Sequence, residues 1–152
     1  MELSKWDTRF MKLAFHISEW SSCIRIGRQV GALTVRDKRV LTTGYNGAPQ
    51  KIMSCAERNE CMRNKNKIES GTKQELCYAV HAEQNAIVQA AKLGISLDGA
   101  TLYCTHHPCA ICTKLIINSG ITRVVYSIEY PDIFAKQLLA EAGIEVMFYD
   151  IN

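Results

Sequence analysis

The second half of the chain alternates between helix-forming and strand-forming segments, and this alternation restricts the possible folds more than any other feature. Three helical segments each close with a glycine, the usual residue just past a helix end: AEQNAIVQAAKLG, CAICTKLIINSG and DIFAKQLLAEAG. Three strand-like segments separate and follow them: ATLYCT, TRVVYS and IEVMFYD. Strands joined through a helix lie parallel in one sheet, with right-handed crossovers. The pattern therefore predicts an α/β fold with three parallel strands.

The first half adds a helix and a hairpin to this arrangement. Apolar residues recur at helical spacing between Trp6 and Trp20, which predicts an amphipathic helix. The segments VGALTVR and RVLTTG flank a charged two-residue turn and predict a β-hairpin, which leads into the loop GYNGAP. Together the two halves predict a five-stranded mixed sheet covered by helices. Residues 50–74 are polar and irregular, with a helical turn expected around residues 56–63 and an exposed loop after it.

The composition fits one globular domain over residues 1–152. The chain is 47% hydrophobic and 22% charged, which is enough to bury a core but leaves little room for a second domain. Its formal charge of +3 is too small to indicate a nucleic-acid-binding face. The N-terminus lacks the apolar core of a signal peptide, and no apolar run approaches the roughly 18 residues of a membrane span. We therefore expect a cytoplasmic protein.

The chain has seven cysteines, which is many for a reducing compartment. In such a compartment cysteines are more often metal ligands or reactive thiols than disulfide partners. An odd number also excludes complete pairing. We therefore expect metal binding rather than a disulfide framework.

Two short motifs, at the starts of two predicted helices, supply candidate metal ligands. Cys109 and Cys112 form a Cys-x-x-Cys pair, whose spacing suits one tetrahedral ion and whose place at a helix N-terminus favours negative sulfur. His81 would complete a three-ligand set that leaves one position open for water, as in catalytic zinc sites. Glu83 can turn toward that water without being a ligand. Taken separately, the motifs also fit a structural zinc half-site, a redox pair or a capping histidine.

Taken together, the motifs match the zinc deaminase signature H-x-E…P-C-x-x-C. The chain resembles the deoxycytidylate (dCMP) deaminase family, within the cytidine deaminase-like superfamily, in the segments HAEQNAI, TLYCTHHPCAICTKLIINSGI and VGA…GYNG. The resemblance implies a three-layer α/β/α cytidine deaminase-like fold, a catalytic Zn²⁺ and usually a homohexamer. It also implies hydrolytic deamination of dCMP to dUMP and ammonia, which supplies dUMP for dTMP synthesis. Glu83 would then carry protons from the attacking water to the cytosine ring and to the leaving amino group.

Four further residues are candidate substrate contacts. By the resemblance, Asn46 of GYNG is the candidate for the sugar 3′-hydroxyl, although asparagine there also suits a left-handed turn. His106 lies in the loop before the metal cysteines, with His107 beside it, and could line the pocket or brace the loop. Tyr126 and Tyr130 could form walls of the pocket, although aromatic residues near a strand end more often belong to the core.

The remaining cysteines outside the two motifs, Cys104 apart, are candidate ligands of a second, structural Zn²⁺: Cys23, Cys55, Cys61 and Cys77. Three of them lie in the polar segment, which cannot bury much apolar surface, and a four-thiolate zinc would supply the missing order. Some dCMP deaminases carry a second zinc in this region, so the resemblance points the same way. The alternative is a set of unrelated buried thiols.

A nucleotide substrate also needs cationic or amide donors for its phosphate. The candidates are Arg25, Arg28 and Gln29 before VGA, and Lys114 near the metal cysteines, with ordinary solvated surface as the alternative. The resemblance further implies activation by dCTP, with Mg²⁺ bound only together with such an effector, and inhibition by dTTP. The effectors would bind at a subunit interface near Arg28 and three residues of the GYNG loop: Gly44, Tyr45 and Gly47. The segment SCIRIGRQVGA is longer before VGA than the family pattern, which puts this regulation in doubt.

Other proteins share the two zinc motifs. A tRNA adenosine deaminase is the main alternative, and the modest charge and the GYNG loop argue against it. A deaminase of riboflavin synthesis would often carry a fused reductase domain, and a guanine deaminase matches the early loop less well. A non-catalytic competence-associated accessory protein is the alternative outside the enzymes, and the presence of Glu83 argues against it.

Overall fold

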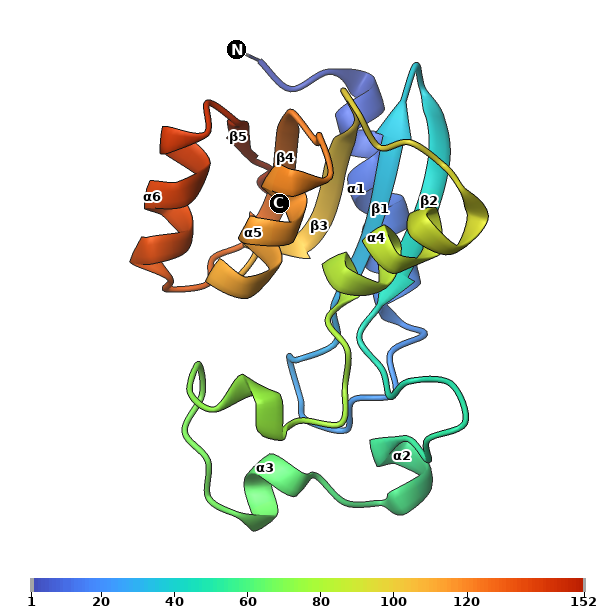
Figure 1. Cartoon of the computed structure of the whole chain (residues 1–152), viewed down its shortest axis with the longest axis vertical. Coiled ribbons are helices and arrows are strands. Elements are labelled where there is room, and N and C mark those ends of the chain that lie inside the picture. The colour runs from blue at the N-terminus through green and yellow to red at the C-terminus, as the bar shows by residue number, and fades with distance from the viewer. Residues whose placement is uncertain (1, 152) are drawn as a thin grey trace.

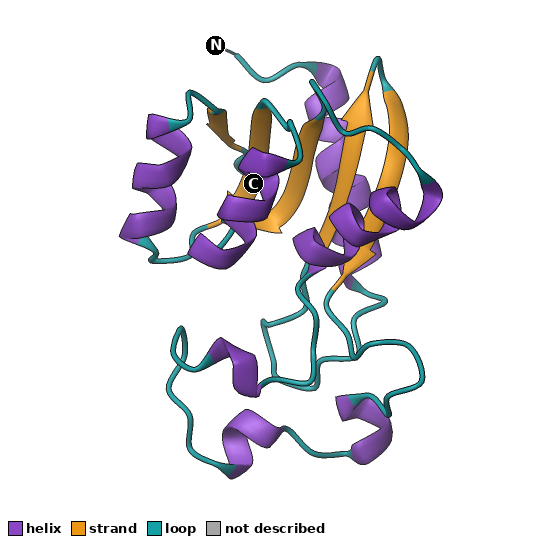
Figure 2. Cartoon of the chain, viewed as in Figure 1, coloured by secondary structure: helices purple, strands orange, loops and turns teal. Residues whose placement is uncertain are grey.

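The computed structural model describes residues 2–151 and contains a five-stranded sheet in the order β2-β1-β3-β4-β5 (Figures 1 and 2). The strands are β1 (Gly31–Arg36), β2 (Arg39–Tyr45), β3 (Thr101–His106), β4 (Arg123–Ile128) and β5 (Glu145–Phe148). Strand β1 pairs antiparallel with β2 and β3, whereas β3, β4 and β5 are parallel. The predicted mixed sheet is therefore confirmed, including its three parallel strands.

Helices cover both faces of this sheet and complete three layers (Figure 1). On one face lies α1 (Lys5–Ser18), and its apolar side packs on Leu33, Tyr103 and Val125. The other face carries α4 (Ala82–Leu93), α5 (Ala110–Asn118) and α6 (Ile133–Glu141). Their buried residues form a second core cluster with the opposite side chains of the same strands, such as Ala32, Leu102 and Val124. Alternation of side chains along each strand thus supplies both cores. The predicted α/β/α fold is confirmed.

A buried carboxylate joins α1 to two strands of the sheet. The Asp7 side chain accepts hydrogen bonds from Tyr103 Oη at 2.7 Å and from an Arg123 Nη at 2.6 Å. It also caps its own helix, because Ser4 N donates to it at 2.7 Å. The Asp7 side chain is only 4% exposed, and these partners hold the pKa of its carboxyl well below its usual range although burial alone would raise it. The ordered start of α1 therefore depends on a charged group in the core.

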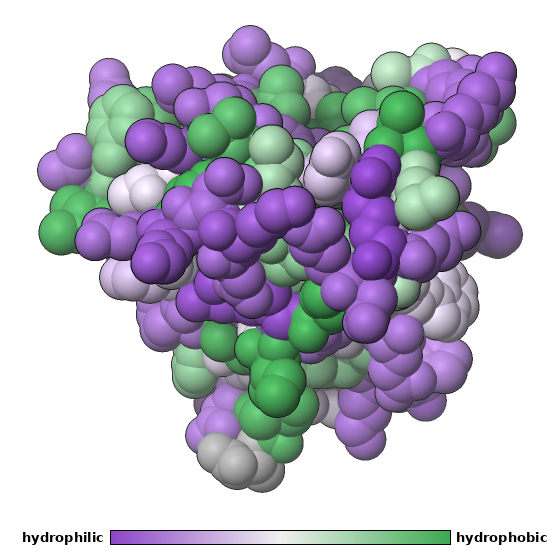
Figure 3. Space-filling view, turned by 90° about the horizontal axis from the view of Figure 1, so that it is seen from below, coloured by the Kyte–Doolittle hydropathy of each residue, from purple (hydrophilic) through white to green (hydrophobic). Residues whose placement is uncertain are grey.

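Residues 48–80 form a separate layer below the sheet in Figure 1. A bridge between Gly47 and Val80 brings the two ends of this segment together where it joins the rest of the fold. This layer holds only short elements: α2 (Cys55–Arg58), α3 (Met62–Lys65) and the 3₁₀ turn η1 (Gln74–Leu76). The helical turn predicted around residues 56–63 is in fact two helices, because Asn59 ends α2 in a left-handed conformation with φ 51°. Figure 3 views the molecule from below and shows a largely hydrophilic surface there.

The other predicted elements lie within a few residues of their expected bounds. The first helix is the main exception at its end, because it stops before Trp20, which is 52% exposed. None of the described helices combines the length and the apolarity that crossing a bilayer requires.

Candidate active site

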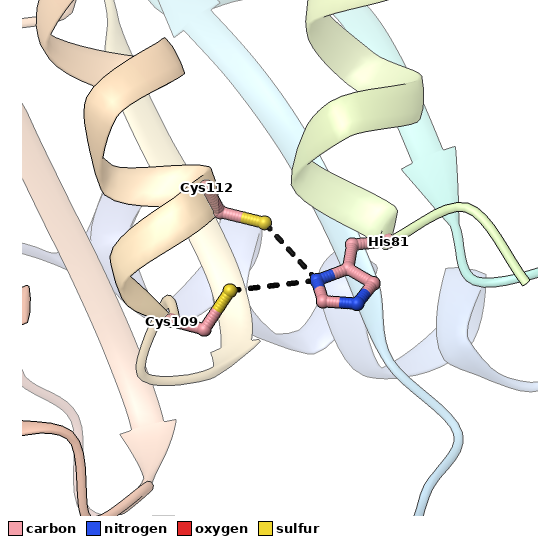
Figure 4. Close-up of side chains that lie close together, drawn as sticks. All are labelled: His81, Cys109 and Cys112. Carbon is pink, nitrogen blue, oxygen red and sulfur yellow. Dashed lines mark hydrogen bonds between the residues drawn. The ribbon is translucent and has the colours of Figure 1, made fainter. Parts of the chain in front are cut away.

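The three predicted metal ligands meet where two helices begin on the same face of the sheet. His81 is the N-cap of α4, Cys109 is the N-cap of α5, and Cys112 lies in the first turn of α5. Figure 4 shows His81 Nδ1 pointing at both sulfur atoms, 3.2 Å from Cys112 Sγ and 3.5 Å from Cys109 Sγ. All three ligand atoms lie within 4.8 Å of one another, and no other group of three among residues 2–151 meets this criterion. Helix starts therefore bring together residues 28 and 31 positions apart.

The electrostatics of the three groups favour a divalent cation. The hydrogen bond from Cys112 lowers the pKa of the Cys109 thiol to about 4, and His81 adds to this effect. The same bond, together with burial, raises the pKa of the Cys112 thiol. A zinc ion binds thiolates and neutral imidazole, and it would hold both sulfurs as thiolates. One nitrogen and two sulfur donors with room for a fourth ligand are a set that suits Zn²⁺.

Glu83 lies in the first turn of α4 and lines the same cavity as His81 and Cys109. It is 5% exposed, and burial raises the pKa of its carboxyl above the ordinary value of 4.5, although His81 works in the opposite direction. The Cys112 thiol interacts with it directly, and the fully buried Cys104 lies beside it. A buried carboxyl beside the metal ligands is placed to pass protons to and from a substrate in the cavity.

A cavity of about 170 Å³ opens in front of these groups, between the sheet and the layer of residues 48–80. Three of the four predicted substrate contacts line it: Asn46, His106 and Tyr130. Two of the predicted phosphate donors, Arg25 and Arg28, line it as well. Burial lowers the pKa of His106, and the nearby charge of Arg28 adds to that shift. The cavity therefore has a metal-ligating side and a cationic side.

Most of the hydrogen-bonding capacity of the Asn46 side chain is used within the protein itself. Its Oδ1 accepts from Val30 N at 2.8 Å and from Ser21 Oγ at 2.6 Å, and its Nδ2 donates to Arg28 O at 2.7 Å. One N–H of the carboxamide remains for a ligand. Asn46 thus joins the GYNG loop to the segment that carries Arg28, and can give a substrate one hydrogen bond at most from its side-chain donors.

Several other predicted residues lie away from the cavity. Tyr126 is not part of its lining, because its ring packs edge-on against His107 and Phe148 and its hydroxyl donates to Glu129. Gln29 uses its amide on the carbonyls of Cys23 and Arg25, which braces the loop.

The remaining candidates near GYNG and on α5 have other roles in the fold. Lys114 lies over the ring of Phe134. Tyr45 is 40% exposed and packs against Trp20. Gly44 lies against the backbone of α4, where an added Cβ would meet Ala82 O and come within 2.6 Å of Ala86 N. Gly44 therefore sets how closely α4, and with it the start of the helix at the metal site, approaches the sheet.

The four remaining candidate metal ligands lie in one part of the cavity, and all are lining residues: Cys23, Cys55, Cys61 and Cys77. Burial raises the pKa of Cys23 and of Cys55, and the neighbouring thiols of this group raise it further. No three of the four sulfurs lie within 4.8 Å of one another. They are neighbours, but in this structure they are not gathered to the spacing of metal ligands.

Two cavity residues carry no signal in the sequence. Arg63 and Gln74 both belong to the polar segment, where no periodicity or motif distinguishes them from solvated residues. In the structure Arg63 is only 6% exposed, which is rare for an arginine. Only the three-dimensional arrangement identifies them.

Residues 4–128 match the family described as the cytidine and deoxycytidylate deaminase zinc-binding region. The chain belongs to this family. ComE operon protein 2 of Bacillus subtilis is 37% identical over 147 residues, which cover 96% of this chain and 72% of that protein. The deoxycytidylate deaminase of Saccharomyces cerevisiae is 39% identical over 144 residues, and the chain spans only 44% of its length.

The fold is also similar to a solved family structure. The crystal structure of the dCMP deaminase from cyanophage S-TIM5 in complex with dCMP and dUMP has a TM-score of 0.79 and 33% sequence identity. The match covers 98% of this chain and all of that chain. The three-layer fold of this chain is therefore that of a dCMP deaminase.

Proposed function

We propose that the chain is a zinc-dependent deaminase that hydrolyses dCMP to dUMP and ammonia. The observation that carries this proposal is the buried Glu83 carboxyl beside a His81, Cys109 and Cys112 cluster in an open cavity. The substrate rests on the similarity to deoxycytidylate deaminases and to a structure that holds dCMP and dUMP. The cationic side of the cavity, at Arg25 and Arg28, suits the 5′-phosphate.

In this mechanism His81, Cys109 and Cys112 would hold a Zn²⁺, whose Lewis acidity would make a water nucleophilic enough to attack carbon 4 of cytosine. Glu83 takes a proton from that water and passes it to N3 of the ring. It then moves the second proton to the amino group, the bond between carbon 4 and nitrogen breaks, and ammonia leaves. Each proton that Glu83 accepts is returned, so the net change is one water consumed and one ammonia released.

The test is ultraviolet-monitored deamination of dCMP, CMP, deoxycytidine and dCTP by the zinc-loaded protein, with Glu83→Gln and Glu83→Ala as inactive controls. We expect turnover selective for dCMP, and a loss of at least about 10²–10⁴-fold in kcat in both variants with zinc retained. Near-normal turnover in the variants would refute the role of Glu83. No turnover of any cytosine compound by the zinc-loaded protein would refute the reaction itself, and would favour another base or the accessory role.

We also propose that Cys23, Cys55, Cys61 and Cys77 bind a second, structural Zn²⁺. Their shared position at one side of the cavity supports this. The layer of residues 48–80 around them has a largely hydrophilic surface (Figure 3), and its only buried residues are Cys55, Cys61 and Arg63, so it has little apolar core of its own. Metal analysis of fully loaded protein should give about two zinc ions per chain, and about one in Cys55→Ser. About one zinc in the unaltered protein would overturn the proposal.

Finally, we propose a cytoplasmic homo-oligomer, a hexamer by the family resemblance, that is activated by dCTP with Mg²⁺ and inhibited by dTTP. Tyr45 of GYNG and the neighbouring Trp20 form an exposed aromatic pair, which supports a subunit contact there. Light scattering should give the mass of six chains. Deamination assays at low dCMP should show a rise with dCTP, and a flat response to both nucleotides would remove the regulatory part of this proposal.

A further inference from the structure

Arg63 is a buried cation that holds a loop by its backbone. Its guanidinium donates to three carbonyl oxygens: Lys73 O at 2.8 Å, Glu69 O at 2.7 Å and Thr72 O at 2.6 Å. Among residues 2–151 no carboxylate lies within ion-pair distance of it. A charged group without a counter-ion is costly to bury, and here its compensation comes from carbonyl dipoles of one short segment.

The segment that Arg63 holds, residues 69–73, forms part of the cavity wall. Its path needs two left-handed residues, Gly71 with φ 79° and Lys73 with φ 43°, so it does not follow from local preferences alone. Gly71 faces Tyr130, because an added Cβ would lie 3.1 Å from the Tyr130 hydroxyl. Ser70 and Gly71 both line the cavity. Arg63 therefore fixes the position of this wall opposite Tyr130.

Gln74 follows this segment directly and presents an unused polar atom. Its Nε2 lies 3.4 Å from the Tyr130 hydroxyl, whereas its Oε1 is buried and has no donor among the described residues. Gln74 and Tyr130 line the same cavity as the metal ligand Cys109 and the cationic Arg28. A buried acceptor without a donor is unfavourable, so a ligand that supplies an N–H or O–H group would gain there.

We propose that Gln74 contacts the nucleotide substrate through Oε1, and that Arg63 is the positioning residue that holds it in place. The ligand group is an N–H or O–H donor of a cytosine nucleotide, either the amino group of the base or the 3′-hydroxyl of the sugar. This inference rests on the proposed function, because it assigns a new contact within the same cavity. It adds a specificity element from a segment that supplies no metal ligand to the catalytic centre.

The first test compares Gln74→Ala with Gln137→Ala, an exposed glutamine on α6, in steady-state deamination. We expect the KM for dCMP to rise about ten-fold in Gln74→Ala, with kcat within about two-fold, and both constants to be unchanged in Gln137→Ala. A substrate without the 3′-hydroxyl separates the two donors. If the hydroxyl is the partner, Gln74→Ala will have no further effect on that substrate; if the amino group is the partner, the ten-fold difference will remain.

The second test concerns Arg63, with Arg39→Met at an exposed site as its control. Arg63→Lys keeps the charge but loses the fork that reaches three carbonyls, so we expect its KM for dCMP to rise with kcat largely retained. Arg63→Met should show a larger KM. A purely structural role would instead lower the melting temperature and the active fraction, at unchanged KM. Where Arg63→Met does not fold, Arg63→Lys and Gln74→Ala still decide the question.

The outcomes separate this inference from the proposed function. If the unaltered protein deaminates dCMP and Gln74→Ala keeps its KM, the inference is overturned and the function stands. If the unaltered protein does not deaminate dCMP, calorimetric titration with dCMP replaces the assay. Weaker binding by Gln74→Ala then supports the contact, and equal binding or no binding by both proteins overturns it.

Discussion

Replacement of Asp7 by asparagine tests whether the buried carboxylate holds α1 to the sheet. The change keeps the size of the side chain and removes its charge. Arg123 therefore loses its buried anionic partner, and Tyr103 Oη can donate only to a neutral amide oxygen. Ser4 N would also face an amide in place of one carboxylate oxygen. Removal of one partner from a buried ion pair costs about 3–5 kcal/mol of unfolding free energy. At about 2–4 °C per kcal/mol for a chain of this length, the melting temperature should fall by roughly 6–20 °C.

The stabilisation that Asp7 contributes should depend on pH, in a direction set by the lowered pKa of its carboxyl. The pKa of Asp7 is lower in the folded protein than its value of 3.8 without such partners, so its contribution is fully present above that value and is lost as the pH falls below it. Thermal unfolding of the unaltered protein, Asp7→Asn and the exposed control Asp37→Asn should be followed by circular dichroism at pH 7 and pH 3. The melting temperature of Asp7→Asn should lie far below that of the unaltered protein at pH 7, and closer to it at pH 3. A loss of melting temperature equal to that of the control at pH 7, or one that grows in acid, would refute the reasoning.

Three further predictions concern the site. Cys109→Ser should lower zinc content at the catalytic centre and abolish turnover, as removal of the metal with a chelator should, and added Zn²⁺ should restore only the unaltered protein. Gly44→Ala should cost about 1–3 kcal/mol and reduce zinc affinity as well, because the added methyl group displaces the start of α4; unchanged metal binding would contradict this link. Asn46→Ala should destabilise the loop by about 1–3 kcal/mol, since Val30 N loses its buried acceptor, and should raise KM; calorimetry and kinetics measure the two effects separately.

Much of the fold follows from pattern alone. The alternation from residue 82 onward predicts the parallel strands, because each helix has its own stop signal and each strand its own apolar run. The metal cluster is equally predictable, since His81, Cys109 and Cys112 all stand at helix starts that one sheet brings to the same edge. In both cases local preference and tertiary structure agree.

The polar layer could not be predicted in the same way. Its order comes from contacts such as those of Arg63 with three carbonyls. Such contacts are not associated with any repeating pattern of residues in the sequence. Tyr126 and Tyr130 show the same limit, because both were expected in the pocket and only Tyr130 lines it. The direction of one aromatic side chain near a strand end depends on its neighbours, here His107 and Phe148 for Tyr126, which the sequence pattern does not specify.

The placement of the three ligands on two separate helices has a thermodynamic consequence. A metal ion held by His81 and Cys109 connects α4 with α5 across 28 positions of the chain, and the same two helices bury Ala86, Ala90, Cys112 and Ile116 behind it. An ion that binds the folded arrangement more tightly than the unfolded chain makes folding stability depend on the concentration of free zinc, by up to RT ln(1 + [Zn]/Kd). Variants that loosen the packing of α4 on α5 should therefore lose their metal at zinc concentrations that still saturate the unaltered protein. Zinc affinity thus measures the fit of the core at a distance from the cavity.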